Sequence, residues 1–182
     1  MSSWGATDAD EAKPKWLTAA QKRDTYATSK GWIYKDPNTG LEEVIVAIGE
    51  LSSAAKLNIA DVTSVVFATT SFSEAAGGNI DITVVYNEKI TVTGSPTITV
   101  TNDQAGSGTD ATFTATYQSG SSTNKLTFRA TYAAANGGVA ENDVLSIADQ
   151  NIALAGGTLV DGEAVNAAVA IAGVTDTLTI SA

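Results

Sequence analysis

The side chains that most often carry out chemistry in enzymes are missing from this chain of 182 residues. It contains no histidine and no cysteine. Histidine is the commonest general base near neutral pH and a frequent zinc or copper ligand, and cysteine supplies thiolate nucleophiles and thiolate metal ligands. Their absence excludes Ser-His-Asp and Cys-His catalytic arrangements, disulfide bonds and thiolate metal sites. We therefore predict no enzymatic activity, no cofactor and no metal requirement.

One short segment matches a phosphate-binding pattern. Residues 106–111, with the sequence Gly-Ser-Gly-Thr-Asp-Ala, fit the G-x-G-x-x-A fingerprint of dinucleotide-binding folds. In those folds the glycine-rich loop opens a helix, whose N-terminus binds the pyrophosphate. Here residues 112–117 alternate threonine with the apolar or aromatic side chains of Phe113, Ala115 and Tyr117, and so predict a strand instead of a helix. We interpret residues 106–108 as a turn between strands.

Several carboxylates fall near predicted turns, where oxygen ligands can bind calcium. They are Asp143, Asp149, Asp161, Glu163 and Asp176. The D-x-D-x-D-G spacing of a calcium loop is absent, so solvated turn carboxylates are the preferred interpretation and a calcium site is the alternative. Two carboxylates flanking a sugar would indicate a glycosidase, but a sequence alone cannot place two of them at the required separation, and we disfavour this interpretation.

The elements that would position any site are predicted to be strands. From residue 62 onward, apolar and hydroxyl side chains alternate, which gives each strand one buried and one solvated face. Short strands in this number, separated by Gly- and Ser-rich turns, predict an Ig-like antiparallel β-sandwich over residues 61–182, without the cysteine pair of antibody domains. The strand candidates are residues 62–69, 80–86, 89–93, 97–102, 111–117, 125–132, 143–148, 151–154, 165–171 and 177–181.

Residues 1–60 differ from the rest of the chain in composition. They hold all three tryptophans and seven of the ten basic residues, whereas residues 61–182 carry three basic and twelve acidic ones. Residues 1–24 predict an extended arm with one short helix, opened by a capping box of Thr18 and Gln21. Residues 25–51 predict a β-hairpin around the turn at residues 36–40. Because an isolated hairpin is marginally stable, it should pack on the sandwich, a sister subunit or a partner.

Aromatic and basic side chains interleave within these 60 residues and suggest a binding surface. Nucleic acid is disfavoured by the net charge of -10, and no apolar run is long enough to span a membrane. Tryptophan and tyrosine dominate protein interfaces, although each could instead cover the core of the hairpin. The predicted partner-binding residues are Trp4, Lys13, Pro14, Trp16, Leu17, Tyr26, Trp32 and Tyr34.

Two parts of the chain resemble known protein families. The N-terminal part resembles the N-terminus of virion structural proteins from tailed phages, especially marine ones. The residues that carry this resemblance are Ser3-Trp4-Gly5, Lys13-Pro14-Lys15-Trp16-Leu17, Thr25-Tyr26-Ala27-Thr28, Gly31-Trp32 and Glu42–Ile48. The remainder is similar to bacterial Ig-like repeats. That similarity rests on Val85-Tyr86-Asn87-Glu88, Val92-Thr93-Gly94-Ser95-Pro96, Leu126-Thr127-Phe128 and Asp143–Ile147.

Together these resemblances imply a capsid decoration (cement) protein on the virion surface. Its N-terminal arm would bind the major capsid protein and sister copies, and its acidic Ig-like domain would project outward. The alternatives are a neck, tail or fibre-associated structural protein, and an adhesin-like Ig module that binds host-surface glycan.

Overall fold

The computed structural model describes residues 13–48, 59–103, 111–132, 139–162, 164–172 and 176–181. Trp4, Glu163 and the turn predicted at residues 106–108 lie outside these ranges. The described chain is mainly β and forms several sheets, which confirms the predicted fold class. The Ig-like topology stays a prediction.

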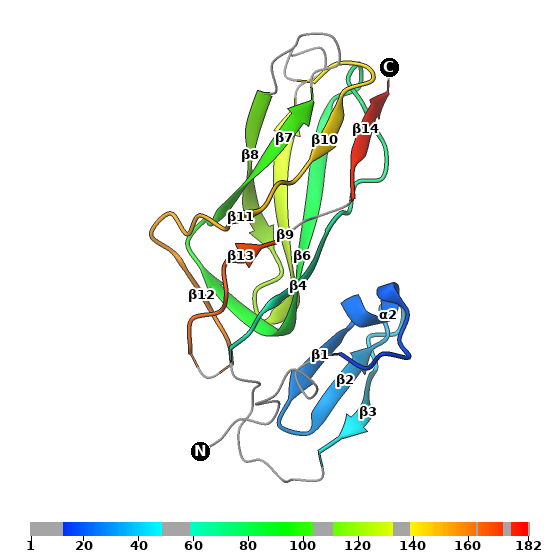
Figure 1. Cartoon of the computed structure of the whole chain (residues 1–182), viewed down its shortest axis with the longest axis vertical. Coiled ribbons are helices and arrows are strands. Elements are labelled where there is room, and N and C mark those ends of the chain that lie inside the picture. Colours follow the sequence, from blue (N-terminus) through cyan, green and yellow to red (C-terminus); the bar gives the residue numbers. More distant parts are fainter. Residues whose placement is uncertain are drawn as a thin grey trace.

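A nine-stranded sheet forms most of the molecule, and its strands run along the long axis (Figure 1). The strand order is β12-β6-β9-β8-β7-β10-β14-β5, and β4 pairs with β6 beside this path. All pairs are antiparallel except β14 with β5, and β11 (Gln150–Asn151) pairs separately with β13 (Ala170–Ile171). The nine strands are β4 (Val62–Phe67), β5 (Phe72–Ser73), β6 (Gly78–Thr93), β7 (Thr97–Asp103), β8 (Ala111–Ser119), β9 (Thr123–Tyr132), β10 (Val144–Ser146), β12 (Thr158–Val160) and β14 (Leu178–Ser181).

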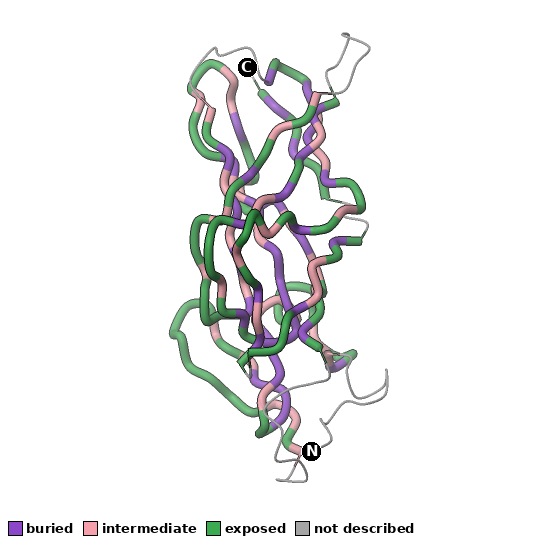
Figure 2. The backbone as a smooth tube through the Cα atoms, turned by 90° about the vertical axis from the view of Figure 1, so that its left-hand side faces the viewer, coloured by how far each residue is buried: buried purple, intermediate pink, exposed green. Residues whose placement is uncertain are grey.

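The core follows from the alternation in the sequence, as the burial pattern of the backbone shows (Figure 2). In β6 and β9 the inward side chains are directly paired across the two strands. These pairs are Ile80 with Ala130, Ile82 with Phe128, and Val84 with Leu126. Fully burying a side chain of this size stabilises the fold by about 1.5–3 kcal/mol. We call this body, residues 59–181, the sandwich.

Strand β6 departs from the prediction. Residues 80–86 and 89–93 were expected to form two strands, but they belong to one strand of 16 residues. Its register against β9 shifts between Val85 and Ile90, and its far end pairs with β12 instead. The alternation also stops here, since residues 84–88 are all buried. A strand buried on both faces must be covered by another part of the chain.

The cover comes from a small body at one end of the molecule, which we call the N-terminal unit (residues 13–48; Figure 1). It consists of α2 (Ala19–Arg23) and a three-stranded sheet in the order β1 (Thr25–Thr28), β2 (Gly31–Lys35) and β3 (Glu42–Ala47). The predicted hairpin is β2 with β3, and β1 adds a strand that was not expected.

Local sequence signals specify the start of α2 and the turn between β2 and β3 in this unit. Helix α2 has the predicted capping box: the Gln21 amide donates to Thr18 Oγ1 at 3.2 Å, and the Thr18 amide donates to Gln21 Oε1 at 3.0 Å. The turn between β2 and β3 forms as predicted, because Asp36 Oδ1 accepts the Asn38 amide at 2.8 Å and Gly40 adopts a φ of +72°.

Candidate partner-binding surface

The sheet of the N-terminal unit builds its own small core. Trp32 packs with Ala27, and Ile45 and Val46 of β3 lie against the pair. The exposed fractions are 3% for Trp32 and 1% for Tyr26. Trp32 and Tyr26 were predicted to bind a partner, with burial in the core of the hairpin as the alternative. The structure corrects the partner-binding prediction for both, because β1 and β3 supply a core around Trp32 and the sandwich covers Tyr26.

The contact between the two bodies is polar and specific. Lys89 of β6 lies 4.5 Å from the centre of the Tyr26 ring and 3.5 Å from Glu42 Oε1, which joins β1 and β3 to the sandwich. Lys125 pairs with Asp24 at the end of α2. Burial, together with the adjacent Glu42 carboxylate, raises the pKa of the Tyr26 phenol, and the same phenol lowers the pKa of Glu42. The hairpin was predicted to pack on the sandwich, a sister subunit or a partner, and in this structure it packs on the sandwich.

Lys13 holds the start of the N-terminal unit in place. Its Nζ donates to the Lys22 carbonyl at 2.8 Å, to Thr63 Oγ1 at 3.1 Å and to the Tyr86 carbonyl at 3.2 Å. Burial, with smaller contributions from the cations Lys125 and Lys22, lowers its pKa to about 7. Pro14, the next residue, is buried as well. Both residues were predicted to bind a partner, and the structure instead gives them intramolecular contacts.

The remaining predicted residues lie nearer the surface. Trp16 is 71% exposed, and Leu17 and Tyr34 are half-buried. Two further apolar side chains were missed by the sequence reasoning: Leu41 is 72% exposed and Val44 is 43% exposed. The spacing of Glu42 and Val44, two positions apart in β3, could have indicated an outward face with an apolar member. Three of the five large exposed apolar side chains of the described chain therefore lie on the N-terminal unit.

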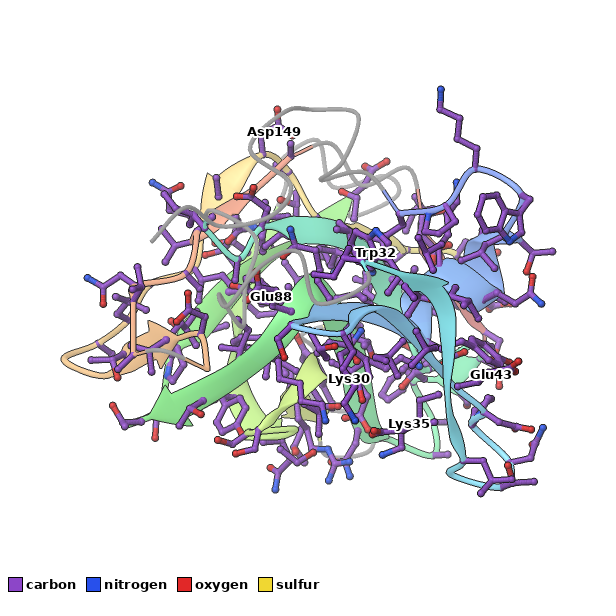
Figure 3. All side chains as sticks on the ribbon, turned by 90° about the horizontal axis from the view of Figure 1, so that it is seen from below. Lys30, Trp32, Lys35, Glu43, Glu88 and Asp149 are labelled. Carbon is purple, nitrogen blue, oxygen red and sulfur yellow. The ribbon has the colours of Figure 1, made fainter. Side chains whose placement is uncertain are left out.

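Strand β3 is an edge strand, so its outer backbone N–H and C=O groups could pair with another strand. It ends the β1-β2-β3 order, and among the described strands it pairs with β2 alone. A register shift between Trp32 and Ile33 leaves Ile45 as an extra residue in β3, and such bulges are common in edge strands. An edge strand with exposed apolar side chains is a common docking place for another strand. Figure 3 views the molecule from this end and labels Trp32 with Lys30 and Lys35.

Two depressions flank this surface. One, of about 300 Å³, lies over the Tyr26–Glu42–Lys89 contact and includes Val44. The other, of about 450 Å³, lies where α2 meets β4, and we call it the basic pocket. The basic pocket is lined by Lys13, Lys15, Ala19, Lys22, Arg23, Thr63 and Ser64.

Three of the five turn carboxylates that were considered for an alternative calcium site accept hydrogen bonds from the chain itself. Asp143 Oδ2 accepts from Asn102 Nδ2 at 2.9 Å and from the Ala140 amide at 2.8 Å. Asp161 accepts the Val165 amide at 2.9 Å, and Asp176 accepts the Phe67 amide at 3.2 Å. Within the described ranges, no three acidic side chains come together in a group that could hold a metal ion.

Comparison with known proteins found no matching protein family, no matching curated protein and no matching solved structure. Across the part of the chain that the structure describes, no helix has the length and apolar character to cross a membrane. The functional argument therefore rests on the contacts and surfaces of the chain itself.

Proposed function

We propose that this protein is a non-enzymatic virion structural protein of the capsid-decoration type. In this proposal the N-terminal unit binds the major capsid protein on the capsid surface, sister copies lie beside it, and the acidic sandwich projects outward. The observation that carries the proposal is the separation of surfaces along the chain. Trp16, Leu41 and Val44 are exposed on the N-terminal unit, which lies at one end of the long axis (Figure 1).

Charge follows the same division. The N-terminal unit carries six basic and four acidic side chains, whereas residues 61–182 carry three basic and twelve acidic ones. Charge of one sign keeps outward-facing domains soluble and apart from one another, while apolar and aromatic side chains supply binding energy where they are desolvated. One end thus suits attachment and the other suits exposure to solvent.

The attachment need not be strong for each copy. Truncating a buried tryptophan anchor to alanine often costs about 2 kcal/mol or more, which corresponds to roughly 30-fold in Kd. Copies that contact one another on a lattice gain further affinity through their high effective concentration. A small surface with one exposed tryptophan and an open strand edge is compatible with this mode of binding.

Sedimentation with capsid shells that lack the protein would test the proposal. We expect Trp16→Ala, and separately Leu41→Ala with Val44→Ala, to weaken binding by at least about tenfold. Val165→Ala is the matched control, because Val165 is an exposed apolar residue (38%) on the sandwich, and it should bind like the wild type. Equal binding by all variants would refute attachment through the N-terminal unit.

Counting copies in purified virions separates this proposal from its structural alternatives. A decoration protein should be present in hundreds of copies, whereas a neck or tail component should be present in a dozen or fewer. Absence from the virion, with retained binding to cell-surface glycan, would instead support the adhesin-like alternative.

A further inference from the structure

The basic pocket concentrates positive charge in a protein with a net charge of -10. It lies between the N-terminal unit and strand β4 of the sandwich and has a volume of about 450 Å³. Four of the ten Lys and Arg residues of the whole chain line it: Lys13, Lys15, Lys22 and Arg23. Like charges cost free energy when they are brought together, so several basic side chains around one depression favour an anionic ligand.

The cations of the pocket fall into two groups. Lys13 already donates to three oxygens and serves to join the two bodies. By contrast, Lys15, Lys22 and Arg23 form no side-chain ion pair with another described residue. The carboxylate of Asp24, the residue that follows Arg23, is engaged by Lys125. Among the described residues, these three cations therefore have no competing carboxylate and can pair with charge from another molecule.

The rest of the lining indicates what kind of anion fits. The pocket is large for a single inorganic ion, and the aliphatic stems of the lysines and Ala19 give it apolar walls. Thr63 and Ser64 of β4 add hydroxyl groups, and the buried Ser64 Oγ has no hydrogen-bond partner in the described structure. These features suit a ligand that combines several negative charges with a carbon skeleton and hydrogen-bonding groups.

We propose that the basic pocket binds an acidic peptide segment of a protein partner, whose carboxylates meet Lys15, Lys22 and Arg23. Arginine can hold a carboxylate with two parallel hydrogen bonds, and the lysines add point charges. Trp16 follows Lys15 directly and is exposed, so an apolar side chain of the same segment has a surface beside the pocket. This inference rests on the proposed function, in which that partner is the capsid protein.

Fluorescence polarisation with a labelled hexaglutamate peptide at low ionic strength would test the pocket without any shell. We expect binding that is lost in high salt, because the interaction is between exposed charges. The test variant is Lys15→Gln with Lys22→Gln, which should weaken binding at least tenfold. The control is Lys30→Gln with Lys35→Gln, which makes the same change in net charge on exposed side chains of the same unit and should change binding less than twofold.

Glutamine has nearly the helix propensity of lysine, so α2 should survive the Lys22 substitution. If the test variant nevertheless melts early, Lys15→Gln alone repeats the test, because Lys15 is exposed and precedes the helix. Equal weakening by the test and control pairs would overturn the pocket, as would no binding of hexaglutamate by the wild type. Preferential binding of inorganic phosphate over hexaglutamate would overturn the choice of an acidic peptide.

The two proposals fail in different ways. If salt and the Lys15→Gln with Lys22→Gln substitutions both leave binding to shells unchanged, the acidic-peptide inference is wrong, but the capsid-decoration proposal is unaffected. Binding of hexaglutamate without any binding to shells would keep the pocket and remove the capsid protein as its partner.

Discussion

The side-chain amide of Asn124, at the start of β9, donates to the backbone carbonyl of Arg23 at 3.1 Å, across 101 positions of the chain. The same nitrogen lies 3.4 Å from the carbonyls of Thr25 and Tyr86. One buried amide therefore joins the end of α2, the start of β1 and the long strand β6. Buried carbonyl groups need such partners, because leaving them unpaired costs free energy.

Replacing Asn124 by alanine should weaken both bodies at once. The carbonyls of Arg23 and Thr25 would lose a buried donor, and we expect the free energy of unfolding to fall by about 1–3 kcal/mol. Urea denaturation would measure the change. Asn151→Ala is the control, because Asn151 is exposed on β11, and its effect should stay within about 0.5 kcal/mol. Equal effects for the two variants would contradict the role given to Asn124.

Local signals in the sequence were sufficient for the fold class, and for the helix cap and the turn between β2 and β3 in the N-terminal unit. The capping box of Thr18 and Gln21 and the turn at residues 36–40 depend on neighbours within four residues, so the sequence alone specifies them. The alternation in residues 126–132 likewise predicted the buried face of β9. Such features are predictable because the backbone geometry and the side-chain pattern are set over the same short range.

Burial of Trp32 and Tyr26 was not predictable in this way. The side chain over the Tyr26 ring belongs to Lys89, and the neighbours of Trp32 in β3 lie beyond a turn. The consecutive apolar residues Val84, Val85 and Tyr86 were the available signal, since they break the alternation and indicate a strand buried on both faces. That signal did not indicate which segment of the chain packs over β6. The basic pocket was missed for the same reason, because Thr63 and Ser64 come from a different body than Lys15 and Lys22.

Trp16 and Trp32 should respond in opposite ways to truncation. Trp32→Ala removes the centre of a small core and should lower the free energy of unfolding by about 3–5 kcal/mol. Trp16→Ala removes a side chain that is 71% exposed and should change stability by less than about 0.5 kcal/mol. Thermal melting followed by circular dichroism would compare them. A large loss of stability with Trp16→Ala would mean that this residue is part of the fold and not of a docking surface.

Two glycines of the N-terminal unit offer a matched test of backbone strain. Gly31, at the start of β2, has a φ of +121°, and a Cβ there would lie 1.9 Å from the Val46 carbonyl oxygen. Gly40 has a φ of +72° with no atom within 4 Å of a Cβ. Gly40→Ala should cost about 1 kcal/mol from the left-handed backbone alone. Gly31→Ala must also push β3 away, so we expect a loss at least about 2 kcal/mol greater in urea denaturation. Similar losses would show that β3 moves without cost.

Lys13 should make stability depend on pH in the alkaline range. Its pKa is lowered from 10.5 to about 7 in the folded protein, chiefly by burial. Below pH 7 the side chain is protonated in both states, so the full cost of burying the charge is present. Between pH 7 and 10.5 the folded state releases this proton while the unfolded state keeps it, and stability therefore rises with pH. The groups that act on Lys13 are Lys125 and Lys22, which lower its pKa, and Asp24, which raises it.

The comparison of wild type with Lys13→Met isolates this effect, because the other titrating groups are common to both proteins. The difference in their free energies of unfolding should shift in favour of the wild type between pH 7 and 9.5, by up to about 3 kcal/mol, since one pKa unit corresponds to about 1.4 kcal/mol. Urea denaturation at pH 6, 7, 8 and 9.5 would measure it. Measurements stop there because burial raises the pKa of Tyr86, whose ionisation at higher pH lowers stability in both proteins. A difference that stays constant from pH 6 to 9.5 would mean that Lys13 keeps its ordinary pKa, held there by its three hydrogen bonds.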